Sequence, residues 1–369
     1  MPVGPELRFL DRTHVVFQGK SYLFFGGTDY HRLASHPEVV AACRQEAEYG
    51  GLSCAGSRIT TGNNPLYQRL EEKLSTFLGA EEVVLCSGGY LSNTVALEAL
   101  ADDYQRFFID SDVHVSLSGP ARCLAPDRVS TFRHAEPGDL SRQIQKSLHS
   151  GERPLVLTDG VASSNGDLSP LGEYWDIVRN RDGLLLVDDA HGIATVGPSG
   201  RGSPEAARIP PGAFVQTGTL SKALGTFGGL VAGSAGLAAR IIDRSQAFAG
   251  ATAIPPPMAA AAIRSIEILQ ANPEMIGGLQ TNTAYVRERL SAMGFVTGFS
   301  PAPIISITHR DTARNERLRL ILLEHGLYLP LIRDYPGSPP GGHFRLTLSS
   351  AHTDQDVERL LKAVAQSCD

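Results

Sequence analysis

The chain has 369 residues, a hydrophobic fraction of 42% and a formal net charge of −6 at pH 7. This length is enough for two packed domains. Acidic and basic residues are mixed along the chain with no basic run, which argues against a nucleic-acid or anionic-membrane partner. Its apolar stretches are broken well short of a membrane span, and its first residues contain no apolar signal core, so we expect a cytoplasmic protein.

The five cysteines form no C-x-x-C pair, and no group of Cys and His residues has the spacing of metal ligands. In a reducing cytoplasm the simplest expectation is free thiols. We therefore predict neither a disulfide framework nor a metal site.

The first strong pattern is a helix over residues 65–78, with one apolar stripe, Pro65 in its first turn and Gly79 at its end. From about residue 82 to 232, short apolar runs then alternate with amphipathic segments. This alternation is typical of a parallel sheet with helices on both faces. The predicted strands are 83–86, 106–109, 154–157, 184–187 and 214–216, and the predicted helices between them are 90–101, 113–124, 138–149 and 170–181.

The pattern changes after Pro255–Pro257, where an Ala-rich helix is predicted to residue 271. The later elements are predicted as a helix near 280–293, a strand near 303–308, a helix near 312–325, a strand at 344–348 and a helix at 354–366. They indicate a smaller α+β domain over 251–369, with the large sheet domain over 46–250 and residues 1–45 packing with the small domain. The Pro- and Gly-rich segment 335–342 predicts a mobile loop.

Lys222 is one of only five lysines in a chain with 33 Lys plus Arg, and it stands among small and apolar residues after the predicted strand 214–216. Lysine, unlike arginine, can lose its proton near neutral pH when it is desolvated or lies near other cations. The position therefore suggests a lysine that forms a Schiff base. The alternative is an ordinary lysine between a strand and a helix.

Several predicted strands end in polar residues, at the edge where open α/β sheets bind ligands. Gly88 and Gly89 precede a predicted helix, whose free N–H groups suit a phosphate, although a simple helix cap explains them equally well. Asp188 ends a buried strand, where a carboxylate is costly unless it meets a cation or a donor. A protonated ring nitrogen of a cofactor would serve, and a helix cap or an ion pair is the alternative.

Three further residues carry weaker indications. His191 alone is more often a structural histidine, the loop that contains Ser163 alone is an ordinary turn, and His114 alone suits a core or capping position as well as stacking on a flat ring. Together with the glycine turn, Asp188 and Lys222, however, they form a specific order along the chain.

That order resembles the α-oxoamine synthases, which are pyridoxal 5′-phosphate (PLP) enzymes of the aspartate-aminotransferase fold, fold type I. The resemblance extends from about Tyr22 to the C-terminus. The matching segments are Thr28-Asp29-Tyr30, Gly56-Ser57-Arg58, Gly89-Tyr90 with Asn93, Thr158-Asp159-Gly160-Val161, Asp188-Asp189-Ala190-His191-Gly192, Gly218 to Gly225, and Arg345 with Ala351-His352-Thr353. The resemblance implies a doubly wound, mainly parallel-sheet domain that binds PLP and a smaller α+β C-terminal domain.

The resemblance also implies roles for the catalytic candidates. Lys222 would hold PLP covalently and then remove the Cα proton of the amino-acid substrate. Asp188 would pair with the pyridine nitrogen, and His114 would stack on the ring. His191 and Ser163 would form hydrogen bonds near the phenolic oxygen.

The same resemblance implies which residues bind the phosphate group of the cofactor. Thr219 and the backbone of Gly89 and Tyr90 would hold the phosphate. Thr252 would reach the phosphate from the neighbouring subunit, which implies a homodimer with its sites at the interface.

For the substrates, Arg345 would bind the amino-acid carboxylate with two parallel hydrogen bonds. Ser57 and Arg32 are further candidates for substrate binding. The implied reaction joins a small amino acid, with alanine favoured, to an acyl thioester of coenzyme A or an acyl carrier protein and releases CO2. An aminotransferase on the same fold, or a cofactor-binding scaffold without turnover, is the alternative.

The chain departs from the family pattern in three places. His31-Arg32 replaces the usual Leu-Gly; either Arg32 meets an anion in a changed acyl site, or the pair forms a surface turn, which is the reading we favour. Ser53-Cys54-Ala55 adds side chains to a glycine-rich segment and predicts a narrower substrate channel. Ser164 and Asn165 stand where the family often has Met and Asp.

Overall fold

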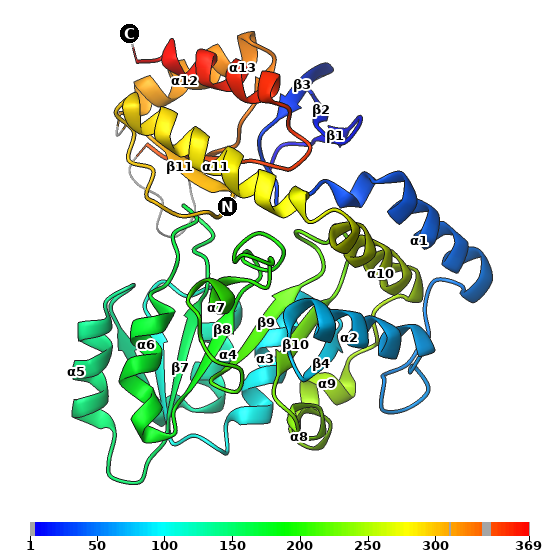
Figure 1. Cartoon of the computed structure of the whole chain (residues 1–369), viewed down its shortest axis with the longest axis vertical. Coiled ribbons are helices and arrows are strands. Elements are labelled where there is room, and N and C mark those ends of the chain that lie inside the picture. The colour runs from blue at the N-terminus through cyan, green and yellow to red at the C-terminus, as the bar shows by residue number, and fades with distance from the viewer. Residues whose placement is uncertain (1–3, 310, 334–340, 369) are drawn as a thin grey trace.

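The computed structural model describes residues 4–309, 311–333 and 341–368. Its centre is a seven-stranded sheet with the order β4-β10-β9-β8-β7-β5-β6, in which β10 runs antiparallel to both of its neighbours and the other pairs are parallel (Figure 1). The strands are β4 (Glu82–Cys86), β5 (Arg106–Asp110), β6 (Val129–Phe132), β7 (Pro154–Asp159), β8 (Leu184–Asp188), β9 (Phe214–Thr219) and β10 (Gly229–Gly233). The predicted fold class is therefore confirmed.

Helices cover both faces of this sheet, because its central strands are apolar on both sides. On β5, Phe107 packs in one cluster with the helices of one face, whereas the next residue, Phe108, packs in another cluster with the helices of the opposite face. The helices of the first face are α3 (Gly89–Leu100), α4 (Val115–Leu124) and α8 (Leu237–Arg244), with the short α9 (Gln246–Gly250) nearby. On the second face lie α5 (Pro137–Ser147) and α6 (Leu171–Val178), and α2 (Pro65–Leu78) packs against β4 and β10.

A smaller layer stands above one end of the large sheet (Figure 1). Its three-stranded sheet has the order β11-β14-β13 and is antiparallel. The elements are β11 (Ile304–Ile307), β12 (Leu327–Tyr328), β13 (Leu331–Ile332), β14 (His343–Thr347), α11 (Glu274–Ala292), α12 (Thr312–Glu324) and α13 (Asp354–Ala365). Helix α10 (Pro256–Ala271) joins the two layers, and a four-residue helix α7 (Ser203–Ala206) lies in the loop after β8.

The N-terminal strands belong to a separate four-stranded sheet with the order β1-β2-β3-β12, where β3 pairs in parallel with β12. They are β1 (Arg8–Phe9), β2 (His14–Phe17) and β3 (Lys20–Phe24), followed by α1 (Pro37–Gly50), which packs along α10. Three single-turn 3-10 helices, η1 (Leu33–Ser35), η2 (Pro126–Arg128) and η3 (Arg179–Arg181), complete the described elements.

Two strands of the large sheet and the start of one helix differ from the sequence-based prediction. β6 is an edge strand with Ser and Thr in its centre, and β10 is a short run between two glycines, so neither has a long apolar run. α11 begins at Glu274, six residues before the predicted start, and continues through Gly277 and Gly278. Residues 335–340 of the predicted mobile loop, 335–342, lie outside the described residues. Within the described chain, no helix has both the length and the apolarity to cross a bilayer.

Candidate active site

Carboxylates and hydroxyls meet at the carboxyl ends of neighbouring parallel strands. Asp159 ends β7 and Asp188 ends β8, and the two residues are partners in register. On the other side, Asp188 is the partner of Thr217 in β9. This edge of a doubly wound sheet is where ligands bind in this class of fold.

Asp188 is held by groups on either side of its strand. One carboxylate oxygen accepts a hydrogen bond of 2.6 Å from Nδ2 of Asn93 in α3, and the other accepts from the Ala190 amide at 3.1 Å. The amide oxygen of Asn93 accepts in turn from the Thr217 hydroxyl at 2.5 Å. Asp188 is only partly buried, so the carboxylate is oriented by these bonds and still open to a ligand.

Asp159 and His114 lie on the other side of Asp188. Burial raises the pKa of Asp159 well above its usual value, and the nearby charge of Asp188 raises it further. The backbone amide of His114 donates to the Asp159 carboxylate at 3.1 Å. The His114 ring caps α4, because its Nδ1 accepts from the Ser116 amide at 3.2 Å. The capping alternative for His114 is thus confirmed, while its stacking on a cofactor ring remains a prediction.

Lys222 lies in the turn that follows β9. The turn closes with a hydrogen bond of 2.9 Å from the Gly225 amide to the Lys222 carbonyl. Gly225 has a φ of 64°, and a Cβ at this position would lie 2.3 Å from the amide nitrogen of Ala34. Only glycine combines this conformation with so close an approach. The Lys222 turn is therefore packed directly on the segment that follows Tyr30.

The Lys222 amine belongs to a chain of three polar groups. Its Nζ lies 2.8 Å from Nε2 of His191, and Nδ1 of the same ring lies 2.6 Å from the Tyr30 hydroxyl. Burial lowers the pKa of Lys222 to about 8, opposed by the Asp188 charge and assisted by that of Arg345. The pKa of His191 is lowered well below its usual value by burial and by the charge of Lys222. A neutral imidazole thus faces an amine that can lose its proton near neutral pH.

The N-terminus of α3 forms a cradle for an anion. The amides of Gly89 and Tyr90 have no acceptor within the helix, as expected for its first residues. A Cβ on Gly89 would lie 2.6 Å from Cβ of Thr219, so only glycine lets the helix end approach β9 this closely. The Thr219 hydroxyl lies 2.6 Å from that of Ser221. Amides and hydroxyls of this kind fit the phosphate of PLP, with Lys222 and Asp188 further along the same edge.

Arg345 projects from β14 of the small sheet toward the large domain. Its Nε donates to the Ser163 carbonyl at 2.7 Å, and its Nη1 donates to the Gly27 carbonyl at 3.2 Å and to the Thr347 hydroxyl at 3.1 Å. Among the described residues it has no ion pair with a carboxylate. A positioned guanidinium without an acidic partner suits a substrate carboxylate. Its charge also reaches Lys222, which places it near the reacting amine.

The expected surface turn at His31-Arg32 is wrong. Both side chains are buried, and Arg32 is only 3% exposed. The guanidinium donates to the carbonyls of Phe24 and Gly26, each at 3.1 Å, and lies over the Phe24 ring. His31 Nε2 is 2.7 Å from the Ala194 carbonyl. These contacts hold the chain next to Tyr30; substrate binding by Arg32 stays a prediction.

Ser57 and Thr252 meet at the phosphate end. They form an isolated β-bridge, and the Ser87 hydroxyl donates to the Thr252 carbonyl. The Thr252 side chain is exposed. Its contact with the phosphate in a neighbouring subunit remains a prediction. Within the described chain, the Ser57 hydroxyl forms a hydrogen bond only with the Thr60 hydroxyl. Its contact with a substrate remains a prediction.

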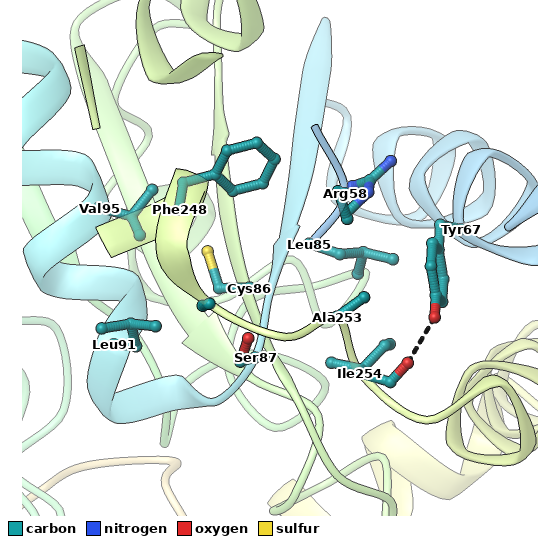
Figure 2. Close-up of a pocket in the computed structure, with 11 residues that line it drawn as sticks. Arg58, Tyr67, Leu85, Cys86, Ser87, Leu91, Val95, Phe248, Ala253 and Ile254 are labelled. Carbon is teal, nitrogen blue, oxygen red and sulfur yellow. Dashed lines mark hydrogen bonds between the residues drawn. The ribbon is translucent and has the colours of Figure 1, made fainter. Parts of the chain in front are cut away.

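A small pocket behind Ser87 adjoins this end of the site (Figure 2). The Tyr67 hydroxyl donates to the Ile254 carbonyl at 2.6 Å there, which anchors the segment that carries Thr252. Its volume of about 10 Å³ accommodates at most one water molecule. Cys54 lies 3.4 Å from the Tyr67 hydroxyl, so the altered segment 53–55 packs on this anchor.

Three residues that shape the site had no assigned role in the sequence reasoning: Tyr30, Asn93 and Asp189. All three stand in the matching segments, but no local pattern indicated which groups they would contact. Asp189 is fully buried and accepts from the Ser203 amide at 2.9 Å, the Ser203 hydroxyl at 2.8 Å and Nε2 of Gln216 at 2.7 Å. It thereby fixes the turn between Asp188 and His191.

Comparisons with known proteins agree with this geometry. Residues 22–364 match the family model of aminotransferase class I and II. The 8-amino-7-oxononanoate synthase of Thioalkalivibrio sulfidiphilus is 36% identical over 358 residues, which cover 95% of this chain and 90% of the relative. That of Methylococcus capsulatus is 35% identical over 356 residues, covering 96% and 91%.

Solved structures give the same result. A serine palmitoyltransferase from Sphingomonas wittichii superposes with a TM-score of 0.87 at 28% identity, covering 97% of this chain and 90% of that one. A structure of SPT with PLP has a TM-score of 0.89 at 26% identity, covering 98% and 90%. With the predicted Schiff-base lysine, carboxylate and anion cradle gathered at one sheet edge, the chain belongs to the aminotransferase class I and II family and is a PLP-dependent acyltransferase of the α-oxoamine synthase group.

Proposed function

We propose that the protein condenses a small amino acid, L-alanine, with an acyl thioester and releases CO2 and the free thiol. With a pimeloyl thioester of coenzyme A or an acyl carrier protein, the product would be 8-amino-7-oxononanoate, a step of biotin biosynthesis in the cytoplasm. Support comes from the relatives of that name at 35% and 36% identity over nearly the whole chain. The single observation that carries the chemistry is the 2.8 Å approach of the Lys222 amine to His191.

Bound PLP supplies an electron sink for the pair left at Cα when its proton is removed. Lys222 is the base for that proton, since its lowered pKa suits general-base catalysis near neutral pH. His191 holds the amine through Nε2 and is held in turn by Tyr30. Asp188 offers a carboxylate to the ring nitrogen and so favours the protonated, electron-withdrawing form of the ring.

The acyl group then joins Cα, and the carboxylate of the amino acid leaves as CO2. Arg345 would orient this carboxylate, because its guanidinium is fixed by the Ser163 and Gly27 carbonyls and has no acidic partner within the described chain. Ser163, whose side chain is partly buried beside this clamp, is the candidate for a hydrogen bond near the phenolic oxygen.

A homodimer is part of the proposal. Two large apolar side chains are exposed at the phosphate end, Tyr90 at 60% and Phe227 at 52%. Phe227 lies against Gly88 at the start of the anion cradle. Exposed apolar groups beside a functional site favour an interface that covers them. A second subunit placed there would bring its Thr252 toward the phosphate.

Other assignments within the group differ in their substrates. Glycine acetyltransferase, serine palmitoyltransferase-like and signal-molecule synthases use the same chemistry with another amino acid or acyl length, and the structural likeness to serine palmitoyltransferase keeps that reading open. An aminotransferase would convert the amino acid to a 2-oxo acid without consuming thioester. A scaffold would bind the amino acid without turnover.

The test is a grid of alanine, glycine and serine against acyl-CoAs from acetyl to palmitoyl, pimeloyl included, with release of free thiol as the readout. The proposal predicts release with alanine and pimeloyl-CoA above every other pair. Faster thiol release with another amino acid and acyl-CoA would assign the protein the activity of another α-oxoamine synthase. Absence of thiol release from every acyl-CoA and from pimeloyl carrier protein, with a 2-oxo acid formed instead, would identify an aminotransferase.

A further inference from the structure

A polar pocket of about 300 Å³ lies where the loop from Ser164 to Asp167 meets the small sheet. Two of its lining residues flank Arg345: His343 is two residues earlier on β14, and Ser306 is the partner of Arg345 in register on β11. Alternation along a strand puts His343 and Arg345 on the same face. Because Arg345 donates to the carbonyl of the residue before Ser164, the pocket adjoins the proposed carboxylate clamp.

His343 is the unusual residue of this pocket. Its side chain is 4% exposed, and its Nδ1 is buried without a hydrogen-bond partner among the described residues. Burial and the charge of Arg345 both lower the pKa of His343, so the ring is neutral near pH 7 and carries one donor and one acceptor. A buried polar atom left without a partner is costly, and a bound ligand is one way to supply that partner.

Among the described residues, Asp167 is the one carboxylate that lines the pocket. The Asp167 carboxylate accepts from Nδ2 of Asn165 at 2.6 Å. Behind the loop, the buried guanidinium of Arg287 donates to the Asn165 carbonyl at 3.2 Å and interacts with the Asp167 charge. Among the described residues, no Lys or Arg lines the pocket itself, and the adjoining guanidinium of Arg345 is held by the Ser163 and Gly27 carbonyls. The pocket therefore offers hydroxyl, amide and imidazole groups to a neutral hydrogen-bonding ligand and gives no cation to an anionic one.

We propose that this pocket binds the pantetheine arm, the amide- and hydroxyl-bearing chain on which coenzyme A and acyl carrier proteins both present an acyl thioester. The assignment rests on the proposed function and identifies one subsite of it. The other parts of the substrates fit less well: the amino-acid carboxylate goes to Arg345, a carboxylate at the end of the acyl chain would meet Asp167, and an alkyl chain would leave the polar groups unpaired.

The position of this pocket also agrees with the departures from the family pattern. Ser164 and Asn165, which stand where the family often has Met and Asp, both line it. A serine in place of methionine leaves more room and adds a hydroxyl, and an asparagine in place of aspartate removes a negative charge. Both changes favour a neutral polar chain over an apolar or charged group.

The test compares two thioesters of the same acyl group, one on pantetheine and one on propanethiol, which lacks amides and hydroxyls. The ratio of their kcat/KM values measures how far the enzyme uses the arm. Two variants change the pocket: Ser164→Met fills it from an exposed position, and His343→Phe keeps a ring of similar size but removes the nitrogens. Ser150→Met, at a serine between α5 and β7 that is also exposed, is the matched control.

The proposal predicts that the wild type prefers the pantetheine thioester and that both pocket variants reduce this preference about tenfold, the effect of losing roughly one buried hydrogen bond. The Kd for the amino acid should not change in the pocket variants. The ratio of the two kcat/KM values in Ser150→Met should equal that of the wild type. A wild type that turns over both thioesters equally, or pocket variants that keep the wild-type ratio, would overturn the subsite alone. Failure of the wild type to release thiol from either thioester or from pimeloyl-CoA would instead defeat the proposed function, and the subsite with it.

Discussion

Nζ of Lys222 lies 2.8 Å from Nε2 of His191, and the opposite nitrogen of that ring is 2.6 Å from the Tyr30 hydroxyl. When the lysine is an ammonium it donates to Nε2, which leaves the ring proton on Nδ1, facing the Tyr30 oxygen. When the lysine is neutral, the ring can take the other tautomer. Tyr30 therefore controls how His191 holds the base.

Replacing Tyr30 by Phe removes one end of this chain while keeping the ring. We expect kcat to fall roughly tenfold, as for the loss of one buried hydrogen bond, with a shifted pH profile and unchanged thioester KM. Steady-state kinetics between pH 6 and pH 9 measure this. A variant with the wild-type profile would show that Tyr30 does not act through His191.

Capture of the cofactor should report the lowered pKa of Lys222. Only the neutral amine attacks an aldehyde, and burial lowers this pKa to about 8 from 10.5. In the cofactor-free protein, the rate of PLP capture should therefore rise with pH and level off above about pH 8. Stopped-flow absorbance follows the reaction, with Lys222→Ala as the blank. A rate still rising steeply at pH 10 would contradict the lowered pKa.

Asp188→Asn should retain PLP but slow removal of the Cα proton, because the neutral amide no longer favours a protonated ring nitrogen. Exchange of the alanine Cα proton in deuterated water, followed by NMR, should fall by about a hundredfold or more. Asp112→Asn, an exposed carboxylate after β5, is the control and should exchange normally. Near-normal exchange in Asp188→Asn would reject the assigned role.

Arg345→Lys should weaken amino-acid binding while leaving the cofactor in place. A lysine keeps the charge but loses the planar pair of donors and the bonds to Ser163 and Gly27. We expect the amino-acid Kd to rise about tenfold or more in a spectral titration. The surface change Arg333→Lys provides the control. An unchanged Kd would place the carboxylate elsewhere.

Asp189 offers a test of stability. Asp189→Ala leaves the Ser203 amide and one of the two N–H groups of Gln216 Nε2 without an acceptor in the core, and it should lower the free energy of unfolding by about 2 kcal/mol or more. Asp189→Asn can satisfy these donors with its oxygen and point its NH2 group at the Ser203 hydroxyl. When the holoenzyme is denatured at pH 6, the free energy of unfolding should be higher for Asp189→Asn than for Asp189→Ala. An equal decrease in both variants would argue against the assigned hydrogen bonds.

The same residue predicts a pH dependence. Burial raises the pKa of Asp189 from 3.8 to about 7. A raised carboxyl pKa contributes stability that is complete below about pH 4 and lost as the pH rises through 7, because only the unfolded chain ionises freely in between. Wild type should therefore lose stability relative to Asp189→Asn between pH 5 and pH 8. A constant difference between their denaturant midpoints would contradict the raised pKa.

Much of the sheet could be predicted because strands such as β7 and β8 are apolar on both faces and end in aspartates. β10 could not, since a run between glycines gains its strand character only from pairing with β4 and β9. Asp188 at the end of β8 and Lys222 in the turn after β9 were found because their local sequence is unusual. The bond from Tyr30 to His191 joins residues 161 positions apart, which no local pattern reveals.

The burial of Arg32 also lay beyond sequence reasoning. A cationic pair in a turn is ordinarily exposed, because a buried charge needs partners. Its partners here are the backbone carbonyls of Phe24 and Gly26, and the sequence does not indicate which carbonyls are free. Likewise, Ser164 and His343 are ordinary residues in their own segments and become notable only because the fold brings them to one pocket.

The proposed reaction is a decarboxylative condensation that depends on Lys222. The most direct test incubates the PLP-loaded protein with carboxyl-labelled L-alanine and pimeloyl thioester and measures labelled CO2 and free thiol together. We expect equal amounts of CO2 and thiol from the wild type, and neither from the Lys222→Ala variant. Thiol release without labelled CO2, or equal amounts from the Lys222→Ala variant, would contradict it.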